Sequence, residues 1–358
     1  MGLLTLPFAV GDRAPAFVGA CASGRFFSLD GQAGRPALIV GLGGLAPDEA
    51  GVLLMRLGGL QASLAAAGVD LVPLSPQTMP FTDRFATDES LADLLIYARG
   101  AEDLVSLSIA GAAGAILIDR GARIVDVLAL KPETDVLDAV RRSADRLGTA
   151  PAQVRASSAP ALIIPNVCPP ELCRALIAHF EASPHAAGVM ASFSDGGAYA
   201  KLDESKKKRR DTELTAESPL FAEVCHVLAA RVIPEIKKAF QAEIANADRI
   251  LIARYDDTGG YFKRHRDNTA PHTAFREWAI SLNLNTDEYE GGELLFPEYD
   301  DARYNPPAGG AIVFSAGLLH EAAPVTKGSR YVLLTFLGSA AAQARLTAWA
   351  ERQQAVAS

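Results

Sequence analysis

The chain has 358 residues, of which 49% are hydrophobic and 21% charged, so it is long enough for two folded domains. Its net charge of −8 argues against a general affinity for nucleic acid, because an excess of Lys and Arg grips the phosphate backbone. Four cysteines without a Cys-x-x-Cys pair favour a reduced, cytoplasmic setting. Residues 1–10 lack the basic residues of a signal peptide, and no apolar run is long enough to cross a bilayer, so we expect no membrane association.

Residues 1–148 alternate between expected strands and expected helices. Strands are expected at 36–41 and 69–75, with a hairpin at 115–119 and 123–130. Helices are expected at 47–66, 89–98 and 134–147. This order predicts an α/β sandwich of the thioredoxin type.

Residues 149–160 (TAPAQVRASSAP) are rich in Ala, Pro and Ser and are interpreted as a linker. The domain expected at 161–338 begins with helices over 169–182 and 221–241, the second kinked near Pro234. Short strands separated by glycine-containing turns follow it, and they are expected at 250–255, 277–285, 292–296, 310–314, 319–325 and 330–337. This pattern predicts an α+β domain containing a double-stranded β-helix, or jelly roll, before a C-terminal helix within 339–358.

Three side chains suggest a metal site. His265 and Asp267 are two residues apart, so both point to the same side of an extended segment. His320 lies in another expected strand and would approach them only where the two sheets of a jelly roll fold over each other. Two imidazoles and one carboxylate hold one face of an octahedral ferrous ion and leave three positions open. Arg330 is expected to open the last strand and point into the barrel mouth, where its planar fork suits a carboxylate.

The segment 161–337, which contains these residues, resembles an Fe(II)/2-oxoglutarate dioxygenase of the prolyl 4-hydroxylase type. The similar stretches are ARYDDTGGYFKRHRDN, SLNLNTDEYEGGELLF and PPAGGAIVFSAGLLHEAAPVTKGSRYVLLTFL. The resemblance implies that His265, Asp267 and His320 bind Fe(II) and that Arg330 binds the distal carboxylate of 2-oxoglutarate. It also implies a contact of Tyr255 with 2-oxoglutarate. Prolyl 4-hydroxylases usually carry Lys in place of Arg330, which leaves the subfamily open.

The resemblance further implies hydroxylation of an unactivated C–H bond, with release of succinate and CO₂ and with ascorbate as a reductant. The substrate is expected to be a prolyl residue, a free amino acid or another small molecule. Asn283 matches a position that lines the 2-oxoglutarate pocket. Alternation along 279–285 allows Ser281 and Asn283 to face a cavity, although an edge strand with a wet outer face explains the pattern equally well.

Two further features compete for a role in the site. His272 is an alternative metal ligand, but its neighbours Pro271 and Thr273 indicate a loop. The run KKKRR, residues 206–210, is interpreted as a solvated mobile loop or as a lid that recruits an acidic substrate or peptide. In the second interpretation Arg209 and Arg210 would contact the substrate.

The N-terminal domain resembles the peroxiredoxin group through VGDRAPAFVGACASGRFFSLDG and GAILIDRGARIVDVLAL. A peroxidase needs a thiolate at the entrance of the first long helix, where this chain has Gly43–Pro47, and Cys21 lies earlier in an expected turn. We therefore expect a non-catalytic domain that scaffolds, presents substrate or forms a homodimer. The alternatives are a redox or interaction protein acting through this domain and a non-catalytic 2-oxoglutarate sensor.

Overall fold

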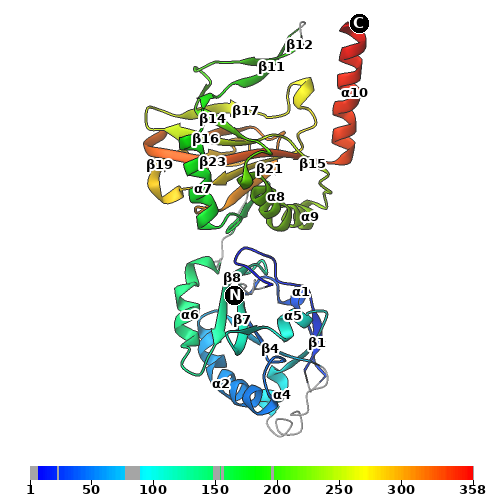
Figure 1. Ribbon diagram of the computed structural model, residues 1–358, viewed down its shortest axis with the longest axis vertical. Helices are drawn as coiled ribbons and strands as arrows, with labels where there is room; N and C mark the ends of the chain where they lie inside the picture. The colour runs from blue at the N-terminus through cyan, green and yellow to red at the C-terminus, as the bar shows by residue number, and fades with distance from the viewer. Residues whose placement is uncertain are drawn as a thin grey trace. The chain divides into compact units, whose positions relative to one another are not determined.

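The computed structural model describes residues 7–21, 24–76, 89–147, 154, 157–194 and 197–357. The chain divides into two compact units, Met1–Ala152 and Gln153–Ser358, called unit 1 and unit 2 below (Figure 1). Most of the linker expected at 149–160 lies outside the described residues. Its end belongs to unit 2, because Ala159 is buried there and the Ser157 hydroxyl donates to the Tyr299 carbonyl at 2.6 Å.

Unit 1 is built on one mixed sheet of eight strands, with the path β2-β1-β5-β4-β3-β7-β6 and β8 paired to β7. The strands are β1 (Val18–Ala20), β2 (Phe26–Ser28), β3 (Ala37–Gly41), β4 (Asp70–Ser75), β5 (Ile96–Arg99), β6 (Ser108–Ile109), β7 (Ala112–Ile118) and β8 (Ile124–Leu130). The neighbours β3, β4 and β5 run parallel, and the other pairs are antiparallel.

Helices cover both faces of this sheet. They are α1 (Leu29–Gln32), α2 (Pro47–Ala66), α4 (Glu89–Leu94), α5 (Glu102–Val105) and α6 (Val136–Arg142), with a 3₁₀ turn at Ala144–Arg146. Side chains alternate along β3, so Leu38 and Val40 pack with α2, α4 and α6, whereas Ile39 packs with α1 and α5. The result is an α/β layered unit with a core on each side of the sheet.

The prediction of a helix at 89–98 is wrong for the second half of that range. The helix α4 ends at Leu94, and Ile96–Arg99 forms β5 between β4 and β1. A helix and a strand would each bury the apolar side chains of residues 96–99. Hydrogen bonding to a strand on either side favours the strand over the helix that the spacing of apolar residues predicts. The helix expected at 134–147 is also shorter, because Ser143 ends α6 and the 3₁₀ turn follows.

Unit 2 contains two sheets that are consistent with a jelly roll. The major sheet has nine strands, with the path β10-β14-β16-β23-β18-β21-β9 and with β15 and β19 paired to β23. The minor sheet has the order β13-β17-β22-β20, and β11 and β12 form a separate hairpin. The strands are β9 (Ala161–Ile164), β10 (Ala186–Ala187), β11 (Met190–Ser194), β12 (Gly197–Lys201), β13 (Lys207–Lys208), β14 (Arg210–Leu214), β15 (Asn246–Ala247), β16 (Ile250–Asp256), β17 (Tyr261–His265), β18 (Trp278–Asn283), β19 (Tyr289–Gly291), β20 (Leu294–Leu295), β21 (Ala311–Ser315), β22 (His320–Ala322) and β23 (Val325–Gly338).

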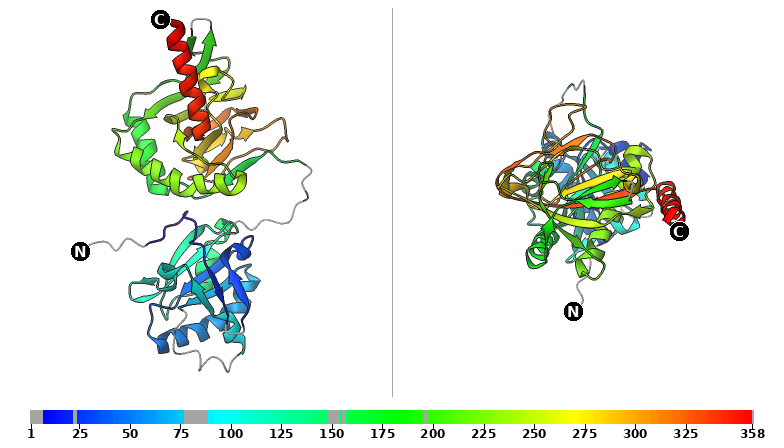
Figure 2. Two further views of the ribbon diagram at one scale, coloured as in Figure 1. Left: turned by 90° about the vertical axis from the view of Figure 1, so that its right-hand side faces the viewer. Right: turned by 90° about the horizontal axis from the view of Figure 1, so that it is seen from above.

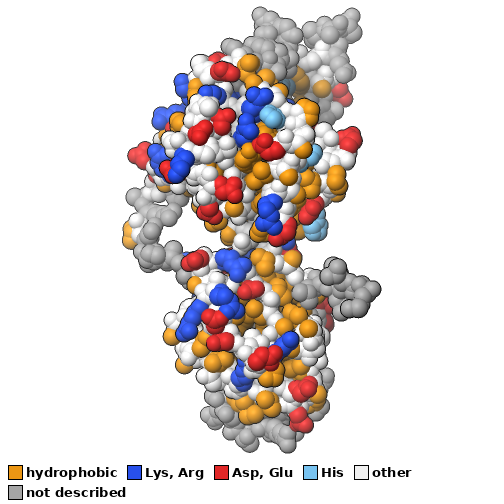
Figure 3. All heavy atoms as spheres, turned by 60° about the vertical axis from the view of Figure 1, so that its left-hand side comes forward, with side chains coloured by type: hydrophobic (Ala, Val, Ile, Leu, Met, Phe, Trp, Pro, Cys, Tyr) orange, Lys and Arg blue, Asp and Glu red, His pale blue; other side chains and the backbone are white. Residues whose placement is uncertain are grey.

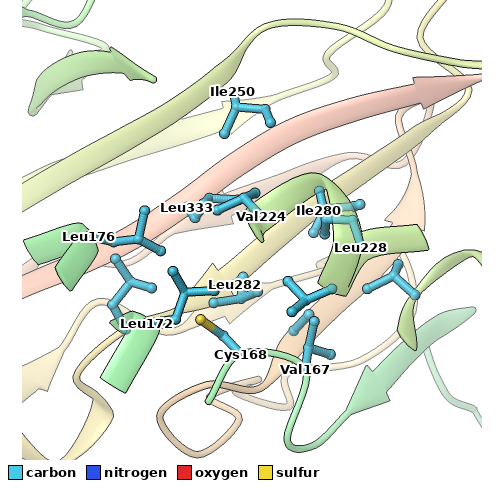
Figure 4. Packing of buried hydrophobic residues seen from close by; sticks show 14 of the residues in the cluster. Val167, Cys168, Leu172, Leu176, Val224, Leu228, Ile250, Ile280, Leu282 and Leu333 are labelled. Carbon is cyan, nitrogen blue, oxygen red and sulfur yellow. The ribbon is translucent and has the colours of Figure 1, made fainter. Parts of the chain in front are cut away.

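Helices pack on the outer face of the major sheet. They are α7 (Pro170–Ala182), α8 (Pro219–Arg231) and α9 (Ile233–Phe240). Figure 4 shows Leu172 and Leu176 of α7 and Val224 of α8 pointing toward Leu282 and Leu333 of the sheet. The break between α8 and α9 confirms the kink expected near Pro234. A second core lies between the two sheets, so the layers are helices, major sheet and minor sheet.

Two elements of unit 2 project from its sheets: the β11–β12 hairpin and the C-terminal helix α10 (Ala340–Ala357) (Figures 1 and 2). Within the described parts of the chain, no helix combines the length and the apolar character needed to cross a membrane.

The last strand differs from the expectation. It begins at Val325 and not at Arg330, so Arg330 lies in the interior of a 14-residue strand. The segment Lys327–Ser329 has the composition of a turn, but Gly328 adopts φ +73° and pairs with Tyr289 of β19. A Cβ at residue 328 would lie 2.5 Å from the Glu288 carbonyl, so only glycine fits this close strand approach.

Candidate metal centre

The two histidines of the predicted metal site face each other across a strand pair. In the minor sheet β17 pairs antiparallel with β22, and His265 lies directly opposite His320. Their ring centroids are 4.2 Å apart. The expectation that they meet only where two sheets fold over each other is therefore wrong. Direct pairing within one sheet already brings opposite side chains into contact.

Asp267 completes the group from just beyond the end of β17. One carboxylate oxygen lies 3.5 Å from His265 Nε2 and the other lies 3.4 Å from His320 Nε2. One ligand atom from each residue lies within 4.8 Å of the others. Among the described residues, this is the group of His, Cys, Asp and Glu side chains that could hold a metal ion.

Backbone carbonyls fix the orientation of both imidazoles. His265 Nδ1 lies 2.7 Å from the Lys263 carbonyl, and His320 Nδ1 lies 3.0 Å from the Leu318 carbonyl. A carbonyl only accepts, so Nδ1 carries the proton in each ring and the Nε2 lone pair is left for a ligand bond. Both Nε2 atoms face Asp267, as a shared metal ion requires.

The charges of the group also fit a divalent cation. Burial lowers the pKa of His320 to about 4, so its imidazole is neutral at neutral pH. Burial acts to raise the pKa of Asp267, but His320 and His265 outweigh it and hold that pKa below its usual range. Two imidazole nitrogens and one carboxylate form the donor set that suits Fe(II) with open positions.

Arg330 lies in the same cavity as a buried cation. It is 2% exposed, and its Nη2 donates to Asn283 Oδ1 at 3.0 Å and to Ser281 Oγ at 3.3 Å. In the described part of the chain, no carboxylate lies within ion-pair distance of it, and its Nε has no hydrogen-bond partner. A buried guanidinium that contacts only neutral groups is costly, so the site is suited to an anionic ligand.

Asn283 lies behind Arg330 and not on the cavity wall. It is fully buried and donates from Nδ2 to Asn305 Oδ1 at 2.8 Å and to the Pro306 carbonyl at 3.1 Å. Asn283 is not among the side chains that line the cavity, whereas Ser281 is, so a contact of Asn283 with the ligand stays a prediction. The structure gives Asn283 the task of orienting the guanidinium.

Tyr255 connects Arg330 to the basic run. It pairs with Arg330 across β16 and β23, and the guanidinium lies 5.4 Å from its ring centroid. The Tyr255 hydroxyl accepts a hydrogen bond from Arg209 Nη1 at 2.9 Å. Its own proton is thereby left to donate into the cavity, which Tyr255 lines.

The run at residues 206–210 is folded into both sheets, so the interpretation as a solvated mobile loop is wrong. The side chains of Lys207 and Arg209 are 4% and 8% exposed and line the cavity, and β13 pairs with β17. Arg210 is exposed and donates away from the cavity to the His185 carbonyl at 3.2 Å. Alternate residues of one short stretch therefore point in opposite directions.

The remaining histidines stay outside the site. His272 lies in the 3₁₀ turn Pro271–Thr273, with its ring 6.1 Å from that of Trp349, and it does not join the metal group. Phe262 and Lys207 also line the cavity, although nothing in the sequence marks either one individually. The Phe262 ring stacks on the His265 ring with 3.4 Å between the ring centroids. Phe262 lies opposite Lys207 because β13 pairs with β17, and no sequence pattern predicts that pairing.

The cavity has a volume of about 820 Å³, which is within the range of small-molecule sites. The metal group, Arg330 and Tyr255 all line it. A five-carbon acid spanning from the metal group to Arg330 would occupy only part of this space.

A family profile and the sequences of relatives agree with this chemistry. A family profile described as the 2OG-Fe(II) oxygenase superfamily matches residues 250–338. A PKHD-type hydroxylase of Picosynechococcus sp. is 32% identical over 157 residues, which cover 42% of this chain and 68% of that relative. A PKHD-type hydroxylase of Maricaulis maris is 30% identical over 115 residues, covering 29% of this chain and 52% of that relative. A solved prolyl hydroxylase from Trichoplax adhaerens aligns with a TM-score of 0.42 and 15% identity, over 51% of this chain and 86% of that one.

The two-sheet fold, the metal-binding group and the sequence profile define the class as 2-oxoglutarate- and Fe(II)-dependent oxygenases. Within this class the chain belongs to the PKHD-type hydroxylases. The matched segments span between about half and about two thirds of the two relatives named above.

Proposed function

We propose that unit 2 hydroxylates an unactivated C–H bond and that His265, Asp267 and His320 hold the Fe(II). The observation that carries the proposal is the meeting of these ligand atoms within 4.8 Å, in a cavity that also contains the unneutralised cation Arg330. Bound Fe(II), 2-oxoglutarate and O₂ would supply the oxidising power, with succinate and CO₂ as co-products.

The side chains around the metal group have separate tasks in this proposal. Arg330 binds the distal carboxylate of 2-oxoglutarate through its planar fork, and Asn283 keeps that fork aligned. Tyr255 donates its hydroxyl proton to the same co-substrate while accepting from Arg209. Phe262 covers one face of His265 and keeps water from it.

Anaerobic titration of the full chain with Fe(II) and 2-oxoglutarate tests the proposal. We expect a weak visible charge-transfer band, which His265→Ala abolishes because it removes one of the three ligands. His272→Ala is the matched control, since this histidine lies outside the metal group, and it should retain the band. A band that persists in His265→Ala, or none in the intact protein, would contradict the assignment.

We further propose that unit 1 is a thioredoxin-like domain without peroxidase activity. The segment between β3 and α2 packs against α5: a Cβ at Gly43 would lie 2.9 Å from the Val105 side chain, and one at Gly44 would lie 3.0 Å from the Ser106 carbonyl. Burial raises the pKa of the Cys21 thiol, which donates to the Asp93 carbonyl, so Cys21 is a poor nucleophile. Peroxide consumption that depends on Cys21 would favour the alternative of a redox protein.

A non-catalytic 2-oxoglutarate sensor is the other candidate. Succinate release by the intact protein without added substrate would speak against pure sensing. Ascorbate as the reductant, a cytoplasmic location and a homodimer stay predictions. Turnover with and without ascorbate and the mass of the protein in solution test the first and the last.

A further inference from the structure

The cavity wall is more cationic than the co-substrate requires. Apart from Arg330, its basic lining includes Lys206, Lys207, Arg209, Arg249 and Lys263, whereas its described acidic lining is limited to Asp267 and Glu321. Asp267 belongs to the metal group, and Glu321 pairs with Arg264 at 3.3 Å. Figure 3 shows Lys and Arg interspersed with Asp and Glu on the face it presents, so the cavity differs from that surface.

Lys207 and Arg209 form the buried part of this positive wall. They share one carboxylate: Asp211 lies 2.7 Å from Arg209 Nε and 3.6 Å from Lys207 Nζ. With Lys207 protonated, these two cations and one anion have a net charge of +1, which suits a single carboxylate of a ligand. Burial acts to raise the pKa of Asp211, but Arg209 and Lys207 hold it below its usual range, so Asp211 stays ionised.

Hydrogen-bond donors remain at both cations. Arg209 Nη1 donates to the Tyr255 hydroxyl and Nη2 donates to Asp211 Oδ2, which leaves one N–H on each Nη atom. Its Nε lies 2.7 Å from Asp211 Oδ1 as an ion pair without a hydrogen bond. Lys207 donates to the Val189 carbonyl at 2.7 Å and contacts Asp211, which leaves a third N–H. Gly188 permits this packing, since a Cβ there would lie 2.7 Å from Asp211 and 2.9 Å from Lys207.

The pair lies next to the metal group. Lys207 Nζ is 5.1 Å and the Arg209 guanidinium carbon 5.8 Å from the centroid of the Phe262 ring, which stacks on His265. An anionic group held by these cations would therefore be one aromatic ring away from an iron ligand. Such a group would position the adjacent carbon chain for the reaction.

We infer that Lys207 and Arg209 form a carboxylate subsite for the primary substrate, which is therefore an acidic compound or an acidic peptide segment. The inference rests on the proposed function. The co-substrate does not account for this subsite, because Arg330 and the metal would take its two ends. Arg249 and Lys263 are exposed at the cavity and would draw an anion toward it.

Succinate release by the Fe(II)-loaded full chain, measured with pairs of probes that differ only in charge, tests the inference. The pairs are L-glutamate with L-glutamine, and a short alanine peptide containing one central glutamate with its glutamine counterpart. Binding of the same probes to the Mn(II)- and 2-oxoglutarate-loaded chain is measured by calorimetry. We expect the acid to be favoured roughly ten- to a hundredfold in at least one pair, the usual range for hydrogen bonds to a charged group. The pair that responds distinguishes a free acid from a peptide.

Arg209→Gln should reduce the preference for the acid over its amide to near unity. The affinity for the acid should fall by a factor at least about ten times larger than the affinity for its amide. Arg210→Gln is the matched control, because this neighbour points away from the cavity and should leave the preference intact. Arg209→Lys should restore part of the preference.

Equal binding of acid and amide by the intact protein would overturn the inference. So would an Arg209→Gln defect confined to the KM for 2-oxoglutarate, since Arg209 would then serve the co-substrate. In both cases Fe(II) and 2-oxoglutarate binding by the intact chain would still stand, whereas failure of the proposed function would appear as loss of that binding.

Discussion

Arg330 contacts neutral partners in the described structure, and this neutrality leaves its charge available for a ligand. Asn283 and Ser281 accept its hydrogen bonds without cancelling its charge. A carboxylate at either position would form an internal ion pair and remove the attraction for an anion. The identity of these two residues therefore bears on co-substrate affinity as directly as Arg330 itself.

Ser281→Asp and Ser281→Asn form a test pair of equal size that differs in charge. We expect Ser281→Asp to bind 2-oxoglutarate about tenfold more weakly than Ser281→Asn, because its carboxylate occupies the guanidinium. The ligand-free thermal midpoint of Ser281→Asp should be at least as high as that of Ser281→Asn. Calorimetric titration and thermal unfolding measure both effects, and equal affinities would refute the role of charge.

Lys207 should make the binding of an acidic substrate depend on pH. Burial and repulsion from Arg209 lower the pKa of Lys207 to about 7, Asp211 opposes them, and Arg249 adds to the lowering. The ammonium is charged below that pKa and neutral above it, so the subsite loses one positive charge as pH rises.

We therefore expect the KM for an acidic probe to rise roughly tenfold between about pH 6 and about pH 9, with the amide probe as control. Lys207→Arg keeps its charge over this range and should flatten the profile. A rise of the same size for the amide would assign the effect to another group.

The sequence singles out the candidate ligands that meet in the cavity, but it does not single out the residues that support them. His265, Asp267, His320 and Arg330 stand out through residue type and spacing. Lys207 and Arg209 belong to a run whose composition is that of a solvated loop. Their burial depends on Gly188 and Asp211, which approach only after the strands pair.

At the scale of the element, long helices with clear boundaries were predictable and short strands were not. The helix α2 spans 47–66 as expected, because Pro47 and the acidic first turn mark its start. The strand β22 has only three residues, and its pairing with β17 depends on contacts remote in the sequence. The same holds for β5, which was expected to be helical.

Gly328 lets β23 continue past β19 to Arg330, so its replacement should disturb both stability and the site. Gly328→Ala combines a positive φ with a 2.5 Å approach to the Glu288 carbonyl. We expect a loss of unfolding free energy of about 2–4 kcal/mol, the larger part from the contact. Gly259→Ala is the matched control, with φ +90° and no atom near its Cβ, and should cost about 1 kcal/mol. Similar losses in denaturant titrations of the two variants would contradict the proposed role of the contact.

For the whole molecule, each unit has its own cores. The clusters that contain Leu54 and Ile39 lie in unit 1, and those that contain Leu282 and Phe296 lie in unit 2. All the residues that we assign to iron, 2-oxoglutarate and substrate lie in unit 2. The division of the chain therefore separates the chemistry from the rest of the protein.

A chain that starts at Val154 should bind Fe(II) and 2-oxoglutarate with an affinity within about threefold of that of the full chain. In the full chain these ligands should raise the unfolding temperature of one transition only, because they bind the folded form of unit 2 alone. Calorimetry with and without a chelator distinguishes the two transitions. A shift of both, or loss of binding in the shorter chain, would show that the units depend on each other.

The glycines at the entrance of α2 have a consequence for protein engineering. Because a Cβ at Gly43 would lie against Val105 and one at Gly44 would lie against the Ser106 carbonyl, a cysteine at either residue would require the end of α5 and the residue after it to shift. At residue 43 a smaller residue in place of Val105 would relieve only part of the clash, because the Val105 carbonyl would still lie 3.0 Å from the new Cβ. The packing at the entrance of α2 therefore disfavours the engineering of a reactive sulfur there.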